Sequence, residues 1–521
     1  FLNVTEEKKM KNNKLKLSIL LIIGIMLGSC NSWLDVLPAN KQASDEYWTS
    51  KEEVESVLAA GYVYLRDIVP DLLELGELRG GCIYDQTSSN KLQIFQIIPS
   101  DDICNWSSFY KVIGMANSVL ANAEGVMEID ETFEESVMKS YLTEAYFLRA
   151  LSYFYIVRNW RDAPLILTPY EDDATSYEVA QSSEDELITQ IKADITAALE
   201  TDAAKTAYDE DYETKGRATI WALYALMADV CLWNEDYADA IIYCNNILEA
   251  SSSFRPEFIS TPSKWYEIFY PGNSNESIFE IQYDQKDYDQ TNKLATTFGN
   301  SSPTYLYTDQ MLKDFTEETT ETGIDDAIRT IYGGYVPNTD EDEYKTATEG
   351  YVWKYSGIGE GDQVRNTTDE QDPNYIIYRV ADIMLMKAEA LVLNSSSTES
   401  WSTAVDLINE IRIRSNLEEI TPSINELNEE DMLNYILYER KMELATEGKR
   451  WYDLLRFGKR NDYEYRETFL INEVTSYNVS ANIAWIKSVL SNDNALYLPV
   501  HEDEIESNSL LEQNPYYDIV N

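Results

Sequence analysis

Residues 439–454 read ERKMELATEGKRWYDL, a stretch in which charged side chains recur at helical spacing. The charged residues that lie three or four positions apart are Glu439, Arg440, Glu443, Glu447 and Arg450. Because residues at this spacing are neighbours on a helix, the pattern predicts an ion network along one side of the segment. Trp451 and Leu454 are expected to pack on the other face, and Gly448 permits a close approach or a break. We interpret the stretch as one that holds the fold together and does not contact a ligand.

Helical periodicity extends outward from this stretch over much of the chain. Apolar side chains recur at helical spacing over residues 45–66, 106–127, 135–160 and 184–199. These ranges are predicted helices, and Ser183 is the expected N-cap of the last one. Residues 76–102 contain several glycines and are predicted to be poor in helix.

Two helical hairpins are predicted further along the chain. Residues 216–234 and 237–250 form one pair, and residues 378–393 and 401–415 form the other. Small side chains at the expected crossing of each pair resemble the tetratricopeptide hairpin. Residues 251–372 separate the pairs, are rich in Tyr, Asn, Gly, Asp and Thr, and are predicted to form strands and loops. We therefore predict a mainly α fold: a helical scaffold with tetratricopeptide-like αα-hairpins and a large irregular insertion, not a regular solenoid.

The N-terminal residues have the pattern of an export signal. Lys11, Lys14 and Lys16 precede an apolar stretch at 17–27, which is too short to span a hydrocarbon core of about 30 Å. Leu27-Gly28-Ser29-Cys30 then resembles a bacterial lipobox, in which the cysteine receives lipid. We expect Met10 to be the natural start, residues 1–29 to be removed, and residues 30–44 to form a lipid-anchored tether. An ordinary signal with an incidental cysteine is the alternative.

Composition excludes several classes of function. The chain of 521 residues has 92 Asp and Glu against 41 Lys and Arg, a formal charge of −51, which becomes −54 once residues 1–29 are removed. This charge argues against binding nucleic acid or an anionic membrane surface. His501 is the single histidine, so a two-histidine zinc site is excluded. A hydrophobic content of 44% is too high for a disordered acidic chain.

Cysteines and acidic clusters suggest no cofactor. Cys82, Cys104, Cys231 and Cys244 lack metal-ligand spacing and are expected to be free thiols, with the pairs Cys82–Cys104 and Cys231–Cys244 as alternatives. Residues 209–213 and 340–343 offer oxygen ligands for Ca²⁺, but they lack EF-hand spacing and are interpreted as solvated acidic loops. Residues 357–361 read GIGEG without the strand–helix context of a dinucleotide site.

Short motifs follow one another in a definite order from residue 30 to residue 517. They are CNSWLDVLP (30–38), YW (47–48), EAYFLRA (144–150) with RDAPL (161–165), GRAT (216–219), INEIRIR (408–414), the 439–454 stretch, and LPV (498–500) with QNPYY (513–517). Each motif alone is weakly specific, but the ordered set resembles the SusD/RagB family. One departure is Arg161-Asp162, where Gly-Asp is typical of the family. Arg149, Arg412 and Arg414 are interpreted as structural, like the charges of 439–454.

The resemblance implies a SusD-like fold and a non-catalytic lipoprotein on the outside of the outer membrane. It implies SusD-like helical regions at 45–250 and 373–521 around the insertion at 251–372. The implied partner is a SusC-like TonB-dependent transporter, and the implied ligand is an oligosaccharide or, alternatively, an oligopeptide. Two competing classes are a surface glycoside hydrolase with two catalytic carboxylates and a scaffold that binds proteins through its hairpins.

A glycan offers hydroxyls and apolar C–H faces, so its receptor needs aromatic platforms beside polar side chains. The resemblance implies a shallow aromatic arc built from loops. Candidates in residues 80–96 are Tyr84, Asp85, Gln86, Asn90 and Gln93; candidates in the insertion are Tyr283, Tyr288, Tyr305, Tyr307, Tyr332 and Tyr335. Strand packing is the ordinary role of any single tyrosine among them, but we expect at least two to line the ligand site. Trp106, Trp221 and Trp353 lie in regular patterns and are expected in the core.

Overall fold

The computed structural model describes residues 47–87, 89–170, 177–292, 294–298, 303–321, 327–333, 352–355, 372–480 and 482–518. Every helix and strand named below belongs to one compact unit, which Ser50–Pro169 and Ser176–Asn521 form. The predictions at Cys30, Tyr335, 340–343 and 357–361 lie outside the described residues, as does the side chain of Tyr332.

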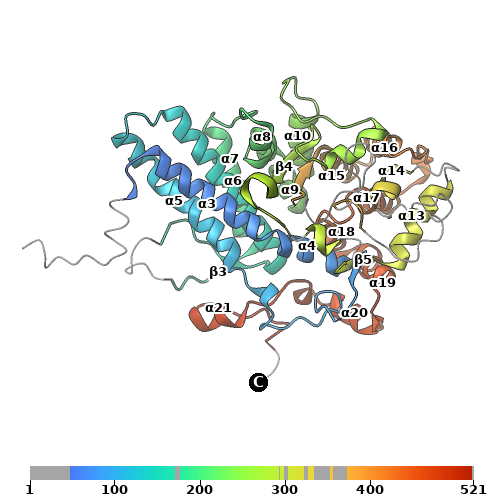
Figure 1. Ribbon diagram of the computed structural model, residues 1–521. Helices are drawn as coiled ribbons and strands as arrows, with labels where there is room; N and C mark the ends of the chain where they lie inside the picture. The colour runs from blue at the N-terminus through green and yellow to red at the C-terminus, as the bar shows by residue number, and fades with distance from the viewer. Residues whose placement is uncertain are drawn as a thin grey trace, which may run out of the picture. The chain divides into compact units, whose positions relative to one another are not determined.

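Four long helices of the N-terminal half pack side by side in chain order (Figure 1). They are α3 (Lys51–Asp67), α5 (Ser107–Ile129), α6 (Glu135–Trp160) and α7 (Glu184–Glu200). Each corresponds to a predicted helix, and the predicted bounds are confirmed to within two residues except at the start of α3, which begins six residues later than predicted. Ser183 caps α7, because its hydroxyl accepts from the Glu186 N–H while the Glu186 carboxylate accepts from the Ser183 N–H at 2.8 Å.

Two helical pairs form the next layer. α9 (Ile220–Trp233) packs on α10 (Tyr237–Leu248), and α15 (Val380–Asn394) packs on α16 (Thr398–Arg414). α10 also contacts α15, so the two pairs are neighbours although the whole insertion separates them in sequence (Figure 1). Fully buried alanines such as Ala222 let these helices approach closely. The helical pairs are confirmed, and their tetratricopeptide-like character stays a prediction.

Short antiparallel strands join the insertion to the helical scaffold. β1 (Ile83–Asp85) pairs with β5 (Tyr305–Tyr307), and β4 (Ser277–Ile281) pairs with β6 (Tyr375–Arg379). Strands in the insertion are thus confirmed. The expectation that it lacks longer helices was wrong, because α13 (Asp309–Glu321) is a helix, and its described buried apolar side chains are Met311 and Phe315. Most of its other residues are charged or polar, so the segment resembles a polar loop in the sequence.

The remaining described elements are short or close the C-terminal region. They are α4 (Val69–Glu77), β2 (Ala163–Pro164), β3 (Gln181–Ser182), α8 (Asp211–Gly216), α11 (Gln285–Tyr288), α12 (Leu294–Thr297), α14 (Ile328–Gly333), α17 (Glu429–Glu443), α18 (Arg450–Tyr463), α19 (Glu473–Tyr477), α20 (Ile483–Leu490) and α21 (Glu502–Ser507). β2 pairs with β3 in an antiparallel ribbon. Between α4 and α5 the described residues contain β1 and short 3₁₀ turns, which agrees with the helix-poor prediction for 76–102.

The 439–454 stretch consists of two helices joined by a turn, because α17 ends at Glu443 and α18 begins at Arg450. Gly448 in the turn has a φ of +71°, in the left-handed region that favours glycine. The break at Gly448 is confirmed, but the prediction of an ion network along one side of this segment was wrong. The turn directs the charged side chains toward different neighbours, so they pair with residues of other elements.

These pairs form what we call the buried ion cluster. Its members are Glu276, Arg329, Lys354, Arg379, Arg414, Glu439, Glu443 and Glu447. Arg379 is central: its guanidinium donates to Glu276 and Glu443 at 2.8 and 2.7 Å and to Glu447 at 2.8 Å. Since removing one partner would leave an uncompensated buried charge, the cluster locks insertion, strands and C-terminal helices together. The structural role predicted for these charges is confirmed.

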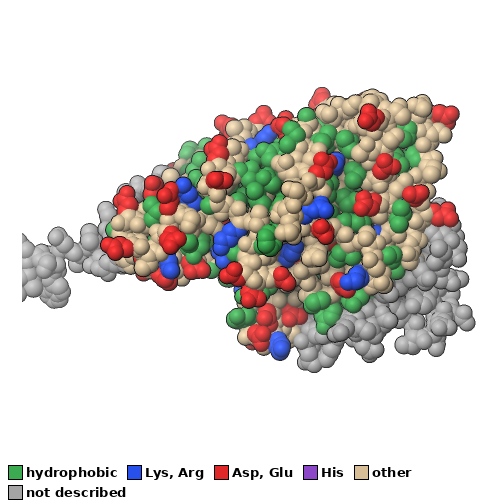
Figure 2. Space-filling model, turned by 90° about the horizontal axis from the view of Figure 1, so that it is seen from above, with side chains coloured by type: hydrophobic (Ala, Val, Ile, Leu, Met, Phe, Trp, Pro, Cys, Tyr) green, Lys and Arg blue, Asp and Glu red, His purple; other side chains and the backbone are tan. Residues whose placement is uncertain are grey.

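Other predicted core residues are also buried. Trp106, Trp221 and Trp353 are at most 5% exposed, which confirms their placement in the core. Arg149 is buried against Asp194, a bidentate pair that joins α6 to α7. The four described cysteines are buried free thiols. On the surface, the face shown in Figure 2 carries many scattered Asp and Glu side chains and fewer Lys and Arg.

Candidate functional site

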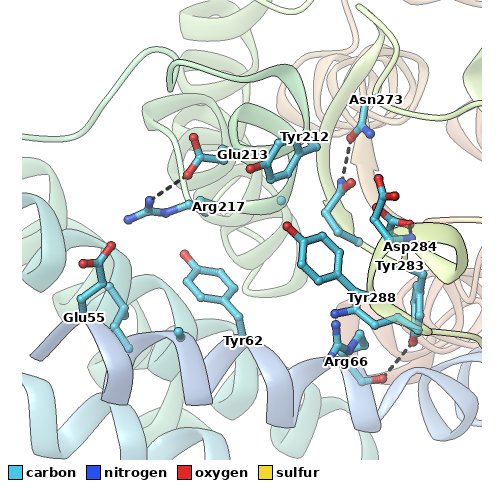
Figure 3. A pocket seen from close by; sticks show the side chains of 16 residues that line it. Glu55, Tyr62, Arg66, Tyr212, Glu213, Arg217, Asn273, Tyr283, Asp284 and Tyr288 are labelled. Carbon is cyan, nitrogen blue, oxygen red and sulfur yellow. Dashed lines mark hydrogen bonds and ion pairs between the residues drawn. The ribbon is translucent and has the colours of Figure 1, made fainter. Parts of the chain in front are cut away.

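A cavity of about 640 Å³ opens between α3, α8 and the segment that follows β4 (Figure 3). Its lining consists of Glu55, Leu58, Ala59, Tyr62 and Arg66 from α3, Tyr212, Glu213, Gly216 and Arg217 at α8, and Asn273, Gln282, Tyr283, Asp284, Asp287, Tyr288 and Gln290 beyond. This volume lies within the range of about 300–1,000 Å³ that is typical of small-molecule sites. Four tyrosines among polar side chains make the lining both aromatic and rich in hydrogen-bonding groups.

Local sequence places the two walls that face α3. Gly216 ends α8 directly against Gln282, where a Cβ atom would lie only 2.5 Å from the Gln282 Cγ. Glycine therefore permits α8 to approach the end of β4. Asp284 caps α11, because its Oδ1 accepts from the Asp287 N–H at 2.8 Å. This short helix directs Tyr288 toward the cavity (Figure 3).

Tyr212 and Tyr288 are the solvent-exposed tyrosines of the lining. Their side chains come from α8 and α11, are 55% and 71% exposed, and lie near each other in Figure 3. Glu213 raises the pKa of Tyr212, and burial and Tyr288 add to this effect, so the Tyr212 hydroxyl keeps its proton near pH 7. The two exposed rings provide the apolar faces on which a sugar ring can stack.

Tyr62 and Tyr283 are the partly buried tyrosines, and hydrogen bonds fix both. The Tyr62 hydroxyl donates to Glu144 at 2.7 Å and accepts from the Ala218 N–H at 2.9 Å. The Tyr283 hydroxyl donates to the Arg66 carbonyl oxygen at 3.0 Å. Burial raises the pKa of both hydroxyls, with a further contribution from Glu144 at Tyr62. These rings are held in place before any ligand arrives.

Arg217 is committed to carboxylates. Its guanidinium donates to both oxygens of Glu144, at 3.0 and 2.7 Å, and to Glu213 at 3.4 Å. Burial alone would lower the pKa of Arg217, but Glu144 outweighs this effect and raises it. Arg217 therefore acts chiefly as a structural support that fixes Glu144 and, through it, Tyr62.

Arg66 differs from Arg217. Its guanidinium lies 5.9 Å from the ring centroid of Tyr283, and no described carboxylate lies within ion-pair distance of it. A guanidinium carries five N–H donors. Arg66 thus presents uncommitted donors at the edge of the cavity, beside the ring on which it rests.

Side-chain amides complete the polar lining. Gln282 donates to the Asn273 Oδ1 at 2.8 Å and accepts from Asn374 at 3.1 Å. Asn374 also accepts from the Tyr283 N–H at 3.0 Å. These hydrogen-bonded amides hold the segment after β4 in place. The lining as a whole thus combines carboxylate, amide and guanidinium groups with the tyrosine rings.

The structure brings Tyr283 and Tyr288 of the predicted ligand residues into this cavity. Tyr84 and Asp85 lie instead on β1, where the Asp85 N–H donates to Gln93 at 2.8 Å. Asn90 accepts from the N–H groups of Leu92 and Gln93 and shapes the following turn. Ligand contact by the residues of this loop stays a prediction.

Three other predicted ligand residues are buried. Gln93 is 1% exposed, and Tyr305 is 4% exposed with its hydroxyl donating to Glu74 at 2.6 Å. Tyr307 is 1% exposed, and its hydroxyl donates to the Gly333 carbonyl oxygen. These side chains stabilise the β1–β5 pair, and we do not include them in the candidate site.

Tyr62, Arg66 and Tyr212 line the cavity but were not predicted as ligand residues. Tyr62 lies in the predicted helix at residues 45–66, where a tyrosine at helical spacing is ordinarily a packing residue. Tyr212 lies within residues 209–213, which were interpreted as a solvated acidic loop, whereas α8 in fact begins at Asp211. The available sequence signal for Tyr212 was an aromatic residue within a strongly acidic cluster. Nothing in the local sequence distinguishes Arg66.

The described residues contain neither a side-chain cluster typical of a metal site nor a helix suited to span a membrane. None of them form a group of three or more His, Cys, Asp or Glu side chains that could hold a metal ion. Within the same residues, no helix combines the length and the apolarity needed to cross a membrane.

Sequence profiles of known families match most of the chain. The profile of the SusD family matches residues 295–517, and a profile described as starch-binding associating with outer membrane matches residues 32–232. The chain belongs to the SusD family. In this SusD family member, α3 and α8 of the candidate cavity belong to the region matched at residues 32–232. The remaining wall consists of residues 273–290, which neither profile matches.

Individual relatives agree with this assignment. SusD-like protein P38 of Formosa agariphila is 28% identical over 506 residues, which cover 87% of this chain and 92% of the relative. A SusD-like protein of Bacteroides ovatus is 25% identical over 478 residues, which cover 85% and 82% of the two chains. Both matches therefore extend over nearly the whole length of the proteins.

Solved structures share the fold. A SusD superfamily protein of Bacteroides vulgatus superposes with a TM-score of 0.72 at 19% identity, covering 90% of this chain and 99% of that one. A structure described as a laminarin-binding SusD-like protein superposes with a TM-score of 0.67 at 22% identity, covering 90% and 100%. The mainly helical SusD-like fold is thus confirmed.

Proposed function

We propose that this SusD family member is a non-catalytic lipoprotein that captures oligosaccharides at the outer face of the outer membrane. In this proposal, lipid on Cys30 anchors it, and it delivers the glycan to a SusC-like TonB-dependent transporter. The observation that carries the proposal is the cavity of four tyrosines, two of them exposed. Support also comes from the family profile described as starch-binding and from the laminarin-binding relative of the same fold.

The lining suits a carbohydrate for chemical reasons. Tyr212 and Tyr288 present flat apolar faces, which match the C–H faces of a pyranose ring. Glu55, Asp287 and Arg66 add acceptors and donors for hydroxyl groups to the same lining. Because Tyr62 and Tyr283 are already fixed by hydrogen bonds, the site requires little ordering on binding, which lowers the entropic cost of association.

Affinity measurements on two tyrosine variants test the proposal. The full chain is first purified in detergent, and neutral oligosaccharides and short peptides are each titrated into it by calorimetry to identify a ligand. Tyr212→Ala and Tyr288→Ala should each weaken glycan binding by about tenfold, because a stacking platform is lost.

Phe254→Ala is the matched control, since Phe254 is an aromatic residue 61% exposed that does not line the cavity. It should leave the affinity unchanged. If only peptides bind, the ligand is an oligopeptide and not a glycan. If neither tyrosine variant changes the affinity, the glycan binds at a different site.

The non-catalytic part of the proposal has its own experiment. The purified protein is incubated with each glycan that it binds, and the products are separated by chromatography. We expect the glycan to be recovered intact. Release of shorter products that persists on repurification would instead assign a hydrolase activity to this chain.

A further inference from the structure

The charges that line the cavity are unequally distributed. The described lining contains the carboxylates of Glu55, Glu213, Asp284 and Asp287 and the guanidinium groups of Arg66 and Arg217. Arg217 is bound on both sides by carboxylates, bidentately by Glu144 and more distantly by Glu213. It therefore offers no uncompensated positive charge to a ligand.

Asp284 and Asp287 form the negative edge of the cavity. Both lie at α11, beside Tyr283 and Tyr288, and no described Lys or Arg pairs with either of them. Asp287 is exposed, and the Asp284 side chain accepts only the backbone N–H that it caps. Any ligand stacked on Tyr288 would thus lie near two uncompensated carboxylates.

Arg66 is the single cation of the described lining without an ion pair, and it does not reverse this balance. It comes from α3 and lies near the ring of Tyr283, a residue of the segment that carries the two aspartates. One acidic group on a ligand would be attracted by Arg66 and repelled by both Asp284 and Asp287, so two like charges would oppose one unlike charge. A polysaccharide with an acidic group on every few sugars would also meet the acidic exterior of the chain.

We infer that this cavity selects neutral saccharides over saccharides that carry carboxylate or sulfate groups, and that Asp284 and Asp287 determine this specificity. The inference rests on the proposed function, because it concerns the substrate class of the same site. In this arrangement the carboxylates accept hydrogen bonds from sugar hydroxyls, and Arg66 donates to a ring or hydroxyl oxygen. Uronates and sulfate esters are excluded by charge, not by shape.

Matched pairs of polysaccharides isolate charge from sugar identity. The purified full chain in detergent is titrated with laminarin, xyloglucan and galactomannan, and with the carboxymethylated form of each. For every backbone that binds, the neutral form should bind about tenfold more tightly at low salt. The preference should shrink when the ionic strength rises above about 0.15 M, because salt screens exposed charges.

A double variant tests the two specificity residues. Asp284→Asn with Asp287→Asn keeps an N-cap for α11 and removes two negative charges. The ratio of carboxymethylated to neutral affinity should rise by about fourfold. The matched control is Asp406→Asn with Glu410→Gln, two exposed carboxylates on α16 that change the total charge equally and lie outside the lining. This control should leave the ratio unchanged.

The outcomes separate the inference from the function on which it rests. Equal or tighter binding of a carboxymethylated form, or an equal effect of the α16 control, would overturn the charge selectivity while glycan capture stands. If no polysaccharide, neutral or acidic, and no oligosaccharide of the array binds, glycan capture itself is contradicted. The inference on charge selectivity is then contradicted too.

Discussion

At the scale of single residues, the buried ion cluster decides stability. Glu443 accepts from Arg379 and pairs with Arg414, and both arginines are fully buried. Both arginines keep other carboxylate partners, but Glu443→Gln leaves the cluster with one buried positive charge in excess, so the free energy of unfolding should fall by about 3–5 kcal/mol. Urea unfolding measures the change. Glu410→Gln, at an exposed position of α16, should change it by less than about 0.5 kcal/mol, and similar values for the two variants would contradict the role of the cluster.

Glu77 predicts a dependence of stability on pH. Burial raises its pKa to about 7, although the N–H groups of Lys449 and Gly448 donate to its carboxylate and limit the rise. The folded chain therefore binds this proton more tightly than the unfolded chain, whose glutamate titrates near pH 4.5. The stability contributed by protonated Glu77 is complete below about pH 4.5 and is lost as the pH rises through about 7.

Glu77→Gln isolates this titration. Between pH 4.5 and 8, the wild-type chain should lose roughly 3 kcal/mol of unfolding free energy relative to the variant. Urea unfolding of both proteins at several pH values gives the difference. A constant difference over that range would show that Glu77 does not titrate there.

At the scale of elements, the turn between α17 and α18 depends on one glycine. A Cβ atom at Gly448 would lie 2.1 Å from the Tyr375 hydroxyl oxygen, and the φ of +71° disfavours any L side chain. Gly448→Ala should therefore lower the free energy of unfolding by more than about 2 kcal/mol. Thermal and urea unfolding measure this loss.

Gly114 in α5 provides the contrasting substitution. Nothing lies within 4 Å of a Cβ atom at this position, and the backbone is helical. Gly114→Ala should raise the unfolding free energy by about 0.5–1 kcal/mol, because alanine favours the helix. Equal destabilisation by both alanines would contradict the explanation from backbone conformation and contact.

At the scale of the whole molecule, Cys30 is predicted to decide where the chain resides. The prediction rests on the lipobox-like residues 27–30. In cells that lipidate exported proteins, Cys30→Ala should move the chain from the membrane fraction to the soluble exported fraction. Immunoblots of separated fractions measure the distribution. A variant that stays with the membrane would contradict the lipid anchor.

Periodicity predicted the long helices and the two hairpins because their apolar faces are wide and local. α6 is the clearest case: its predicted and observed bounds coincide at residues 135 and 160. α13 was missed because its described buried apolar contacts are few. The partners of Glu443 and Glu447 were also beyond prediction, since Arg379 lies more than 60 positions away and meets them only through the β4–β6 pair.

The sequence by itself determined the fold class and the family, because these depend on local spacing and on motifs in a fixed order. Only the tertiary structure decided which tyrosines form a site. Tyr283, Tyr288 and Tyr305 are chemically alike and lie in one irregular region, yet the first two line the cavity and the third is buried on Glu74. The physical reason is that a site is made by surfaces from α3, α8 and α11 that meet in space, and exposure depends on packing that no local pattern specifies.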